Sequence, residues 1–331
     1  MRSGVFFLVS LLVGAALYAG AVALGNDYTF FAGYVVLQYV VLATAWNILG
    51  GYCGYVNFGS AAFFALGAYS TVAMHKLSPM PIPVLVVIGG VVSGLVGLGM
   101  GYLTLRLRGA FFAIATLALA VVLQTLIVNW DYVGGSRGAY IVRPEALAPF
   151  GGYVRYLFVV MLVLAIGAIT VARLIERSWL GYGFASIRDD ELAAEASGVP
   201  TLRLKVIATV ISGALMGMAG APFPYYIGFL QPSSAFGLDY AVNSIAMPLI
   251  GGTTSWLGPL LGAVLLGSLQ QIATVTISSA VNLLIVGLLL VAFVIVAPRG
   301  IVGLFERDKR NAFVGRRPVT GTPESAPGKK P

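Results

Sequence analysis

Side chains that could carry chemistry are few in this sequence. It has one cysteine, Cys53, and one histidine, His75, so neither an internal disulfide nor a metal site built from several such ligands is indicated. Its long apolar segments contain no HExxH motif, no GxSxG motif and no paired carboxylates. These features predict that the chain is not an enzyme and holds no metal.

Acidic residues, in contrast, gather in one place. The stretch IRDDELAAEASGVPTLRLK at 187–205 holds four of the twelve acids within seven residues, namely Asp189, Asp190, Glu191 and Glu195. In a chain that is 59% hydrophobic, such a cluster predicts a segment that is exposed to water.

A short helix is predicted over 187–198. Ser186 and Asp189 are residue types that cap helix N-termini, Gly198 suits the position after the last turn, and Pro200 prevents continuation. A helix of about eleven residues is marginal when isolated in water, so this one needs a surface on which to dock.

The side chains of this helix allow two interpretations. A narrow apolar stripe along it is formed by Leu192, Ala193, Ala196 and Val199. Glu191 and Glu195 are four residues apart, a spacing at which like charges repel unless a cation lies opposite, and Arg188 is placed to supply part of that charge. The helix either lies on its own protein or docks on a cytosolic partner that supplies energy.

The composition defines the class of protein. Only 10% of the residues are charged, the mean hydropathy is +0.92, and apolar runs of about 20 residues recur along the chain. The sequence therefore predicts an all-α, polytopic transmembrane helix bundle. Apolar spans are expected at 5–24, 30–49, 56–74, 82–105, 109–128, 153–172, 205–226, 257–276 and 280–297. The segment 239–252 is shorter and contains Pro248, so it forms either a broken span or a re-entrant segment, and we count it as the tenth span.

The basic residues predict the orientation. With ten spans and an N-terminus on the inside, 16 of the 20 Lys and Arg residues lie on the inner side, and the positive-inside rule favours this arrangement. Both termini and the loop 173–204 are then cytoplasmic, in a multi-pass protein of the inner membrane. The net charge of +8 lies beside membrane ends, so it needs no nucleic-acid partner.

The two ends of the chain have their own patterns. The N-terminus also resembles a signal peptide, with MRSG, an apolar run and then Ala-Val-Ala at 21–23. Cleavage of such a peptide would leave the remaining topology unchanged. Residues 306–331 are rich in Pro, Gly, Ser and charge, so we expect a disordered cytoplasmic tail. That tail is either a solvated end or a contact for anionic membrane lipid.

Small residues recur at intervals of four in three of the predicted spans. They are Ser93, Gly97 and Gly101, then Gly213, Gly217 and Ala221, and finally Gly258 and Gly262. The spacing places each set on one helix face and predicts that helix backbones approach closely there.

The centres of the predicted spans carry no Asp, Glu, Lys or Arg, which argues against a proton relay. Neutral polar residues occur instead, and each either bonds neighbouring helices or lines a polar path. Asn57 and Ser60 are our candidates for a substrate path. The stretch from Gly51 to Gly59 can interrupt the helix and free backbone groups there.

Three stretches together resemble the LivM-type permease subunits of branched-chain amino-acid ABC importers. They are NILGGYCGYVNFGSAAFFALGAYS at 47–70, RLRGAFFAIATLA at 106–118 and SIRDDELAAEASGV at 186–199. The resemblance implies the ABC importer permease fold, with a transmembrane permease domain at 1–305 whose 173–204 loop carries a coupling helix. In that family the coupling helix docks into a groove of the ATPase. By resemblance this role falls to Asp190, Glu191, Ala194, Glu195 and Gly198.

The same resemblance implies partners. The chain has no GxxxxGK[ST] P-loop, so ATP would be bound by two separate ATP-binding subunits and the chain would need no cofactor of its own. A second, homologous permease subunit would complete the pore. An extracytoplasmic substrate-binding protein would deliver branched-chain or similar small apolar amino acids for import.

Two departures from the family pattern leave alternatives open. Gly198 follows Glu191 by seven residues instead of six, and Ser60 stands where relatives often have His. Closely similar permeases carry urea, amides or other amino acids, and these substrates remain an alternative. An ion-coupled secondary carrier is a further alternative, and transport that persists without ATP would distinguish it.

Overall fold

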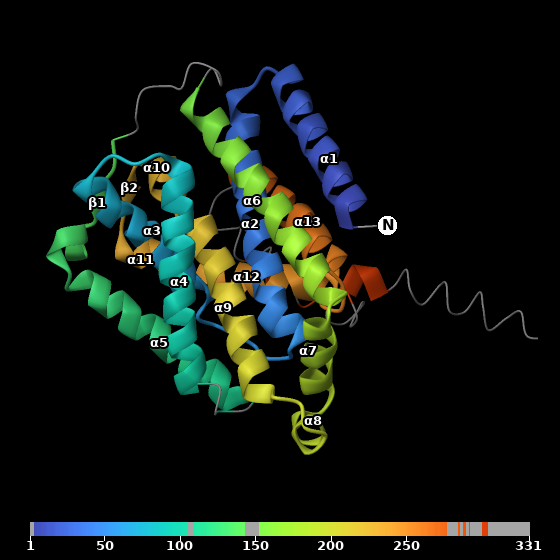
Figure 1. The fold of residues 1–331 in the computed structure, drawn as a ribbon. Helices are drawn as coiled ribbons and strands as arrows, with labels where there is room; N and C mark the ends of the chain where they lie inside the picture. Colours follow the sequence, from blue (N-terminus) through green and yellow to red (C-terminus); the bar gives the residue numbers. More distant parts are fainter. Residues whose placement is uncertain are drawn as a thin grey trace, which may run out of the picture.

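The computed structural model describes residues 3–104, 107, 109–142, 152–276, 284, 287, 288, 291 and 300–303. Nearly all of the regular structure in this part of the chain is helical, and the helices pack into one bundle (Figure 1). Seven of the described helices are long and apolar enough to cross a membrane. The prediction of an all-α, polytopic membrane protein is therefore confirmed.

The seven helices coincide with seven of the predicted spans. Two of them continue into a short further helix, η1 after α2 and α10 after α9. Their bounds are α1 (Ser3–Ala23), α2 (Asp27–Asn47) with the π-helix η1 (Ile48–Tyr52), α4 (Ile82–Thr104), α5 (Ala110–Val128), α6 (Tyr153–Glu176), α9 (Thr201–Gly220) with α10 (Phe223–Ile227), and α13 (Leu257–Thr276).

Two shorter helices occupy two further predicted spans, α3 (Ser60–Leu77) and α12 (Leu238–Gly251). With 14 residues and Pro248 inside it, α12 is about 21 Å long, less than the roughly 30 Å of a bilayer core. The structure thus has a short, proline-containing helix where a broken or re-entrant span was predicted. The predicted span 280–297 and the 306–331 tail lie outside the described residues, apart from the isolated positions 284, 287, 288 and 291.

Helices α3, α4 and α9 meet closely at the centre of the bundle (Figure 1). A Cβ atom added to Gly67 of α3 would lie 2.0 Å from the carbonyl oxygen of Gly217 in α9. One added to Gly217 would lie 2.2 Å from the Ser93 hydroxyl of α4. Only glycine allows this approach, so the predicted close packing of small residues is confirmed at Ser93 and Gly217.

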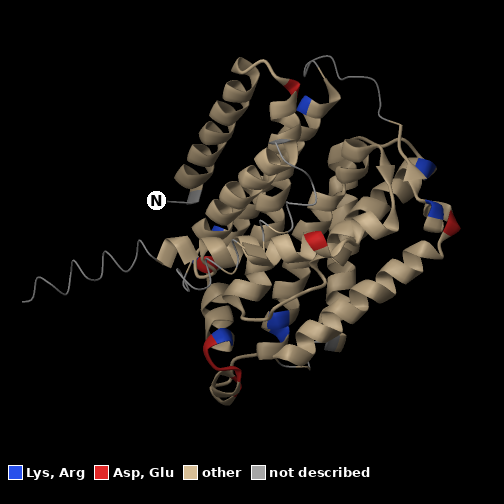
Figure 2. Ribbon diagram, turned by 180° about the vertical axis from the view of Figure 1, so that it is seen from behind, with Lys and Arg blue, Asp and Glu red and all other residues tan. Residues whose placement is uncertain are grey.

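Apolar and charged side chains are sorted as a membrane requires. Figure 2 shows Lys, Arg, Asp and Glu mainly at helix ends and in connections, with long tan stretches of helix that carry none of them in between. At the edge of the bundle, α1 and α5 expose large apolar side chains such as Leu8 and Phe111. Such surfaces suit contact with lipid or with another membrane subunit.

The two ends of the bundle differ in structure. At one end, which we call the β1 end, β1 (Ala139–Tyr140) pairs antiparallel with β2 (Phe229–Leu230), beside η2 (Asp131–Val133), η3 (Gly135–Arg137) and α11 (Pro232–Ala235). At the opposite end, the α8 end, α7 (Trp179–Asp189) and α8 (Glu191–Ala196) form a hairpin between α6 and α9 that projects beyond the bundle (Figure 1).

Candidate functional site

The acidic cluster folds as two helices instead of one. The backbone of Asp190 is extended, with φ −160° and ψ 107°, and this residue separates α7 from the six-residue α8. Its carboxylate accepts a hydrogen bond from the Ala193 N–H at 3.1 Å and so caps α8. The predicted caps, Ser186 and Asp189, were therefore wrong, because an aspartate that bonds a nearby backbone amide competes with helix continuation. Gly198 ends the segment with φ +84°, as its type predicted.

One face of α8 points away from the protein. Leu192 is 63% exposed, and Ala193, Glu195 and Ala196 are exposed as well. Three residues of the predicted apolar stripe, Leu192, Ala193 and Ala196, therefore face outward, whereas Val199 packs against the permease. Ala194 is the residue of α8 that is buried against the protein.

Glu191 points inward, where it pairs with a lysine of the next helix. The Lys205 ammonium of α9 lies 2.7 Å from a Glu191 carboxylate oxygen, and the two side chains are only 3% and 12% exposed. The cation that lies opposite Glu191 is thus Lys205, whereas Arg188 pairs with its neighbour Asp189 at 3.4 Å. Glu195 accepts a hydrogen bond from the Thr201 hydroxyl at 2.7 Å.

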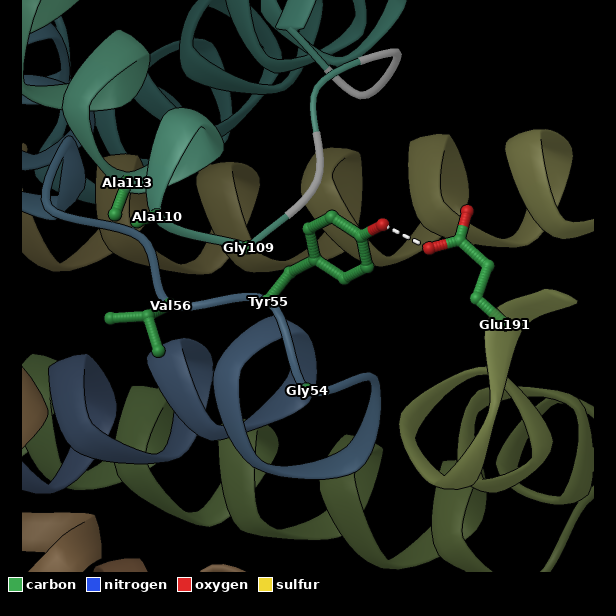
Figure 3. A pocket seen from close by; sticks show the side chains of 7 residues that line it. All are labelled: Gly54, Tyr55, Val56, Gly109, Ala110, Ala113 and Glu191. Atoms are coloured by element: carbon green, nitrogen blue, oxygen red, sulfur yellow. Dashed lines mark hydrogen bonds between the residues drawn. The ribbon is translucent and has the colours of Figure 1, made fainter.

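A tyrosine completes the inward-facing cluster. The Tyr55 hydroxyl donates a hydrogen bond to the second carboxylate oxygen of Glu191 (Figure 3). It also accepts one from Lys205 at 3.2 Å. Lys205 also lies 4.8 Å from the centre of the Tyr55 ring, within the range of a cation–π contact. We call Tyr55, Glu191 and Lys205 the buried triad. Tyr55 and Lys205 were not predicted as site residues, because their partner is far away in the sequence.

A cavity of about 360 Å³ adjoins the triad. Figure 3 shows the Tyr55 and Glu191 side chains meeting on one side of it, with the beginning of α5 on the other. Its lining comes from Gly54, Tyr55, Val56, Gly109, Ala110, Ala113 and Glu191. The space is partly open to the surface, so it is a cleft beside the triad and not an enclosed void.

Tyr55 belongs to a break between two helices. Residues 53–59, which we call the 53–59 segment, are not helical and connect η1 to α3. The Trp46 indole donates to the Asn57 carbonyl oxygen at 2.8 Å, and the Asn57 side chain accepts from the Gly59 N–H at 2.7 Å. The Phe58 N–H bonds the Thr116 hydroxyl at 3.1 Å. The predicted interruption between Gly51 and Gly59 is thus confirmed.

Asn57 and Ser60 are both 1% exposed, and they lie at the end of this segment and the beginning of α3. The Ser244 hydroxyl of α12 donates to the Ser60 hydroxyl at 2.8 Å, which brings α12 to the break. The Asn57 amide nitrogen is buried without a hydrogen-bond partner among the described residues. Their role in a substrate path stays a prediction.

A second polar group crosses the bundle away from the triad. Gln270 of α13 donates to the Asn243 side chain of α12 at 2.8 Å, and Asn243 donates to the Tyr39 hydroxyl of α2 at 3.3 Å. These bonds tie three helices together in the apolar interior. Of the two roles expected for neutral polar residues in the spans, Asn243 and Gln270 thus have the interhelical one.

Metal ligands do not gather in the described part of the chain, where no three His, Cys, Asp or Glu side chains come together. His75 is instead 2.9 Å from the Tyr225 hydroxyl. Burial raises the pKa of the Cys53 thiol to about 12. Ser136 stands in a GxSxG sequence outside the spans, yet it lies on the 3₁₀ turn η3 and not between a strand and a helix, as a nucleophile elbow requires.

Irregular backbone within a helix bundle is a feature of membrane transporters, where it lies buried in protein or beside an internal path. The fold and the site therefore define a polytopic helical membrane protein of the transporter class.

The chain belongs to the family described as branched-chain amino acid transport system / permease component, whose family pattern matches residues 28–294. A permease component is by this description one part of a larger transport system.

Three relatives illustrate the range of this similarity. The high-affinity branched-chain amino acid transport system permease protein LivM of Escherichia coli (strain K12) is 27% identical over 89% of this chain and 74% of its own length. The probable branched-chain amino acid transport permease protein LivH of Methanocaldococcus jannaschii is 25% identical over 75% of this chain and 83% of its own. The L-arabinose ABC transporter permease protein AraH of Azospirillum brasilense is 25% identical over 57% of this chain and 56% of its own length. No solved structure matches the chain.

Proposed function

We propose that this protein is the permease subunit of an ATP-binding cassette importer for leucine, isoleucine and valine. The family and the LivM relatives support the substrate class. The observation that carries the coupling to ATP is α8, a helix that projects from one end of the bundle with Leu192 63% exposed beside the acids Asp189, Asp190 and Glu195. An apolar stripe bordered by charge at the end of a membrane bundle suits docking on a soluble partner.

In this proposal the partners are those that an importer needs. Two ATP-binding subunits dock on the α8 end, a second homologous permease subunit completes the pore, and an extracytoplasmic binding protein delivers substrate at the β1 end. The protein lies in the inner membrane with both termini in the cytoplasm, as the 16 of 20 basic residues on that side favour. ATP is held by the partner subunits.

The division of α8 into two faces refines the roles of its residues. Asp190, Glu195 and Gly198 lie on exposed parts of the segment and would meet the ATPase, whereas Glu191 and Ala194 face the permease. Asn57 and Ser60 would line the substrate path beside the 53–59 segment. A path of neutral groups with apolar walls suits a small zwitterion that is bound only transiently.

The exposed face of α8 supplies the test of ATPase coupling. In the complete complex reconstituted into liposomes with its binding protein, Leu192→Asp should abolish most ATP-dependent leucine uptake and weaken co-purification of the ATP-binding subunits. Leu192→Met keeps the apolar contact and is the matched control, since volume-conserving apolar exchanges are well tolerated. Normal uptake by Leu192→Asp would show that α8 is not the docking element.

The substrate is tested in the same liposomes by comparing radiolabelled leucine, urea, glutamate and L-arabinose. We expect ATP-dependent uptake of leucine alone. Uptake of urea or L-arabinose without leucine would reassign the substrate while leaving the ATP coupling intact. Uptake that persists without ATP would favour an ion-coupled carrier.

A further inference from the structure

The buried triad joins three parts of the protein that are distant in sequence. Glu191 is the first residue of α8, Lys205 lies in the second turn of α9, and Tyr55 belongs to the 53–59 segment. The three polar groups contact one another directly, with the Lys205 ammonium 2.7 Å from Glu191 and 3.2 Å from the Tyr55 hydroxyl. The helix exposed at the α8 end is therefore bonded to the helix break in the interior.

Burial makes this connection stiff. Lys205 and Glu191 are almost fully removed from solvent, so separating them would leave an unpaired charge in a medium of low dielectric constant. Surface ion pairs lack this property, because water replaces their partners easily. When α8 is displaced, Glu191 and Lys205 should thus move together and carry the Tyr55 hydroxyl with them.

A second contact ties the same elements. The Arg188 guanidinium at the end of α7 lies 3.5 Å from the Gly51 carbonyl oxygen, a long contact. Gly54 packs directly against it, since a Cβ atom there would lie 3.0 Å from the Arg188 side chain. With φ +80°, Gly54 also has a backbone conformation that favours glycine. The α7–α8 hairpin thus holds the beginning of the 53–59 segment from two sides.

The side of the segment that faces α5 is packed only in part. The cavity of about 360 Å³ separates Gly54, Tyr55 and Val56 from the beginning of α5. Toward α5 the segment is held by an edge-to-face contact of Tyr55 with Phe112, whose ring centres are 5.1 Å apart, and by the hydrogen bond from Phe58 to Thr116. The triad thus connects α8 to a segment that also contacts α5, so a displacement of α8 can reach it directly.

We propose that Tyr55, Glu191 and Lys205 are positioning residues that transmit the displacement of α8 to the 53–59 segment and so to Asn57. This inference rests on the proposed function, in which ATPase motion reaches the permease through α8. Asn57 is two residues beyond Tyr55, and its side chain accepts from the Gly59 N–H just before α3. A shift of Tyr55 therefore changes the orientation of the buried amide at the beginning of α3.

The test replaces the charges without leaving one unpaired. Glu191→Leu combined with Lys205→Met exchanges a buried ion pair for apolar side chains, which is often neutral or stabilising for the fold. Tyr55→Phe removes one hydroxyl from the triad. Tyr52→Phe is the matched control, because the Tyr52 hydroxyl bonds the Glu176 carboxylate of α6 at 3.4 Å and so connects to no residue of α8 through that bond.

The first measurement is the amount of leucine transported per ATP hydrolysed by the reconstituted complex. We expect this ratio to fall on the order of tenfold in the double variant and in Tyr55→Phe, as the loss of a hydrogen bond to a charged group predicts. ATP hydrolysis itself should continue, and Tyr52→Phe should keep the wild-type ratio. A merely structural triad would instead lower the yield of folded protein and leave the ratio of the surviving complexes unchanged.

The second measurement follows the segment itself and does not depend on the substrate. Val56 is 41% exposed, so Val56→Cys is introduced as a labelling site in a Cys53→Ala background. The rate at which a thiol reagent labels this cysteine is compared between the ATP-free and the vanadate-trapped complex. We expect ATP to change this rate several-fold with the triad intact and to leave it unchanged with Glu191→Leu and Lys205→Met.

The outcomes separate the two proposals. A labelling rate that never responds to ATP with the triad intact, or that still responds in the double variant, overturns the role of the triad. A response that requires the triad in a complex that takes up no leucine supports the triad and refutes the substrate. Unchanged coupling ratios in every variant likewise exclude transmission through Tyr55.

Discussion

The close approach of α3 and α9 makes a sharp prediction about Gly67. In Gly67→Ala the new methyl group would lie 2.0 Å from the Gly217 carbonyl oxygen, about 1.4 Å closer than the 3.4 Å at which ordinary contact begins. The obstacle is backbone, so no side chain can rotate away. The two helices must separate, and α4 must follow, because Gly217 in turn packs on Gly89 and Ser93.

The cost can be estimated from this geometry. Overpacking a close-packed interior costs about 1–3 kcal/mol, and a clash with backbone belongs at the upper end of that range. For a chain of this size such a loss lowers the melting temperature by roughly 5 °C. Gly99 of α4 is the matched control, because a Cβ atom there meets nothing within 4 Å, and alanine has the better helix propensity.

The measurement is thermal unfolding of the purified permease in mild detergent, followed by tryptophan fluorescence. Gly67→Ala should melt roughly 5 °C below the wild type, whereas Gly99→Ala should melt at or slightly above it. Equal melting temperatures for the two variants would refute the reasoning, because they would show that α3 and α9 do not touch at Gly67.

Three further predictions follow from exposure and burial. The first concerns orientation and uses intact cells that carry one introduced cysteine in a Cys53→Ala background. A membrane-impermeant thiol reagent should label Ser136→Cys, which is exposed at the β1 end, and should not label Ser197→Cys. The opposite labelling pattern would invert the topology. In the native chain, Cys53 is buried and this burial raises the pKa of its thiol, so maleimide labelling in detergent at pH 7 should stay slow until the protein is unfolded; ready labelling of the folded protein would contradict its burial. Asn57→Ala and Ser60→Ala should each lower leucine uptake without changing the melting temperature by more than about 2 °C, and unchanged uptake in both would remove them from the path.

The sequence was sufficient to predict the parts of this fold that depend on local composition. Apolar runs located the helices α1, α4, α5 and α6 because a membrane span needs about 20 apolar residues in succession. The glycines between Gly51 and Gly59 correctly indicated a helix break, since glycine weakens a helix wherever it stands.

The parts that sequence reasoning missed depend on distant residues. Lys205 is 14 positions from Glu191 and on another helix, and Tyr55 is 136 positions away, so no local spacing could have paired them. Arg188 was predicted to supply charge opposite Glu191, because residues three apart lie on one face of a continuous helix. The extended backbone at Asp190 ends α7 between the two residues, so they do not share a helix. The same extended residue is why one predicted helix is two in the structure.

The short length of α8 explains how its residues are divided. Six residues cannot hold a helix in water by themselves, so the position of α8 must come from tertiary contacts. Those contacts involve the Asp190 cap, the buried Ala194 and the pairing of Glu191 with Lys205. Glu195 adds a hydrogen bond from the Thr201 hydroxyl of α9, whereas the Leu192 side chain is 63% exposed and is left for contact with a partner. Substitutions on the two faces should accordingly separate into those that release α8 from the permease and those that release it from the ATPase.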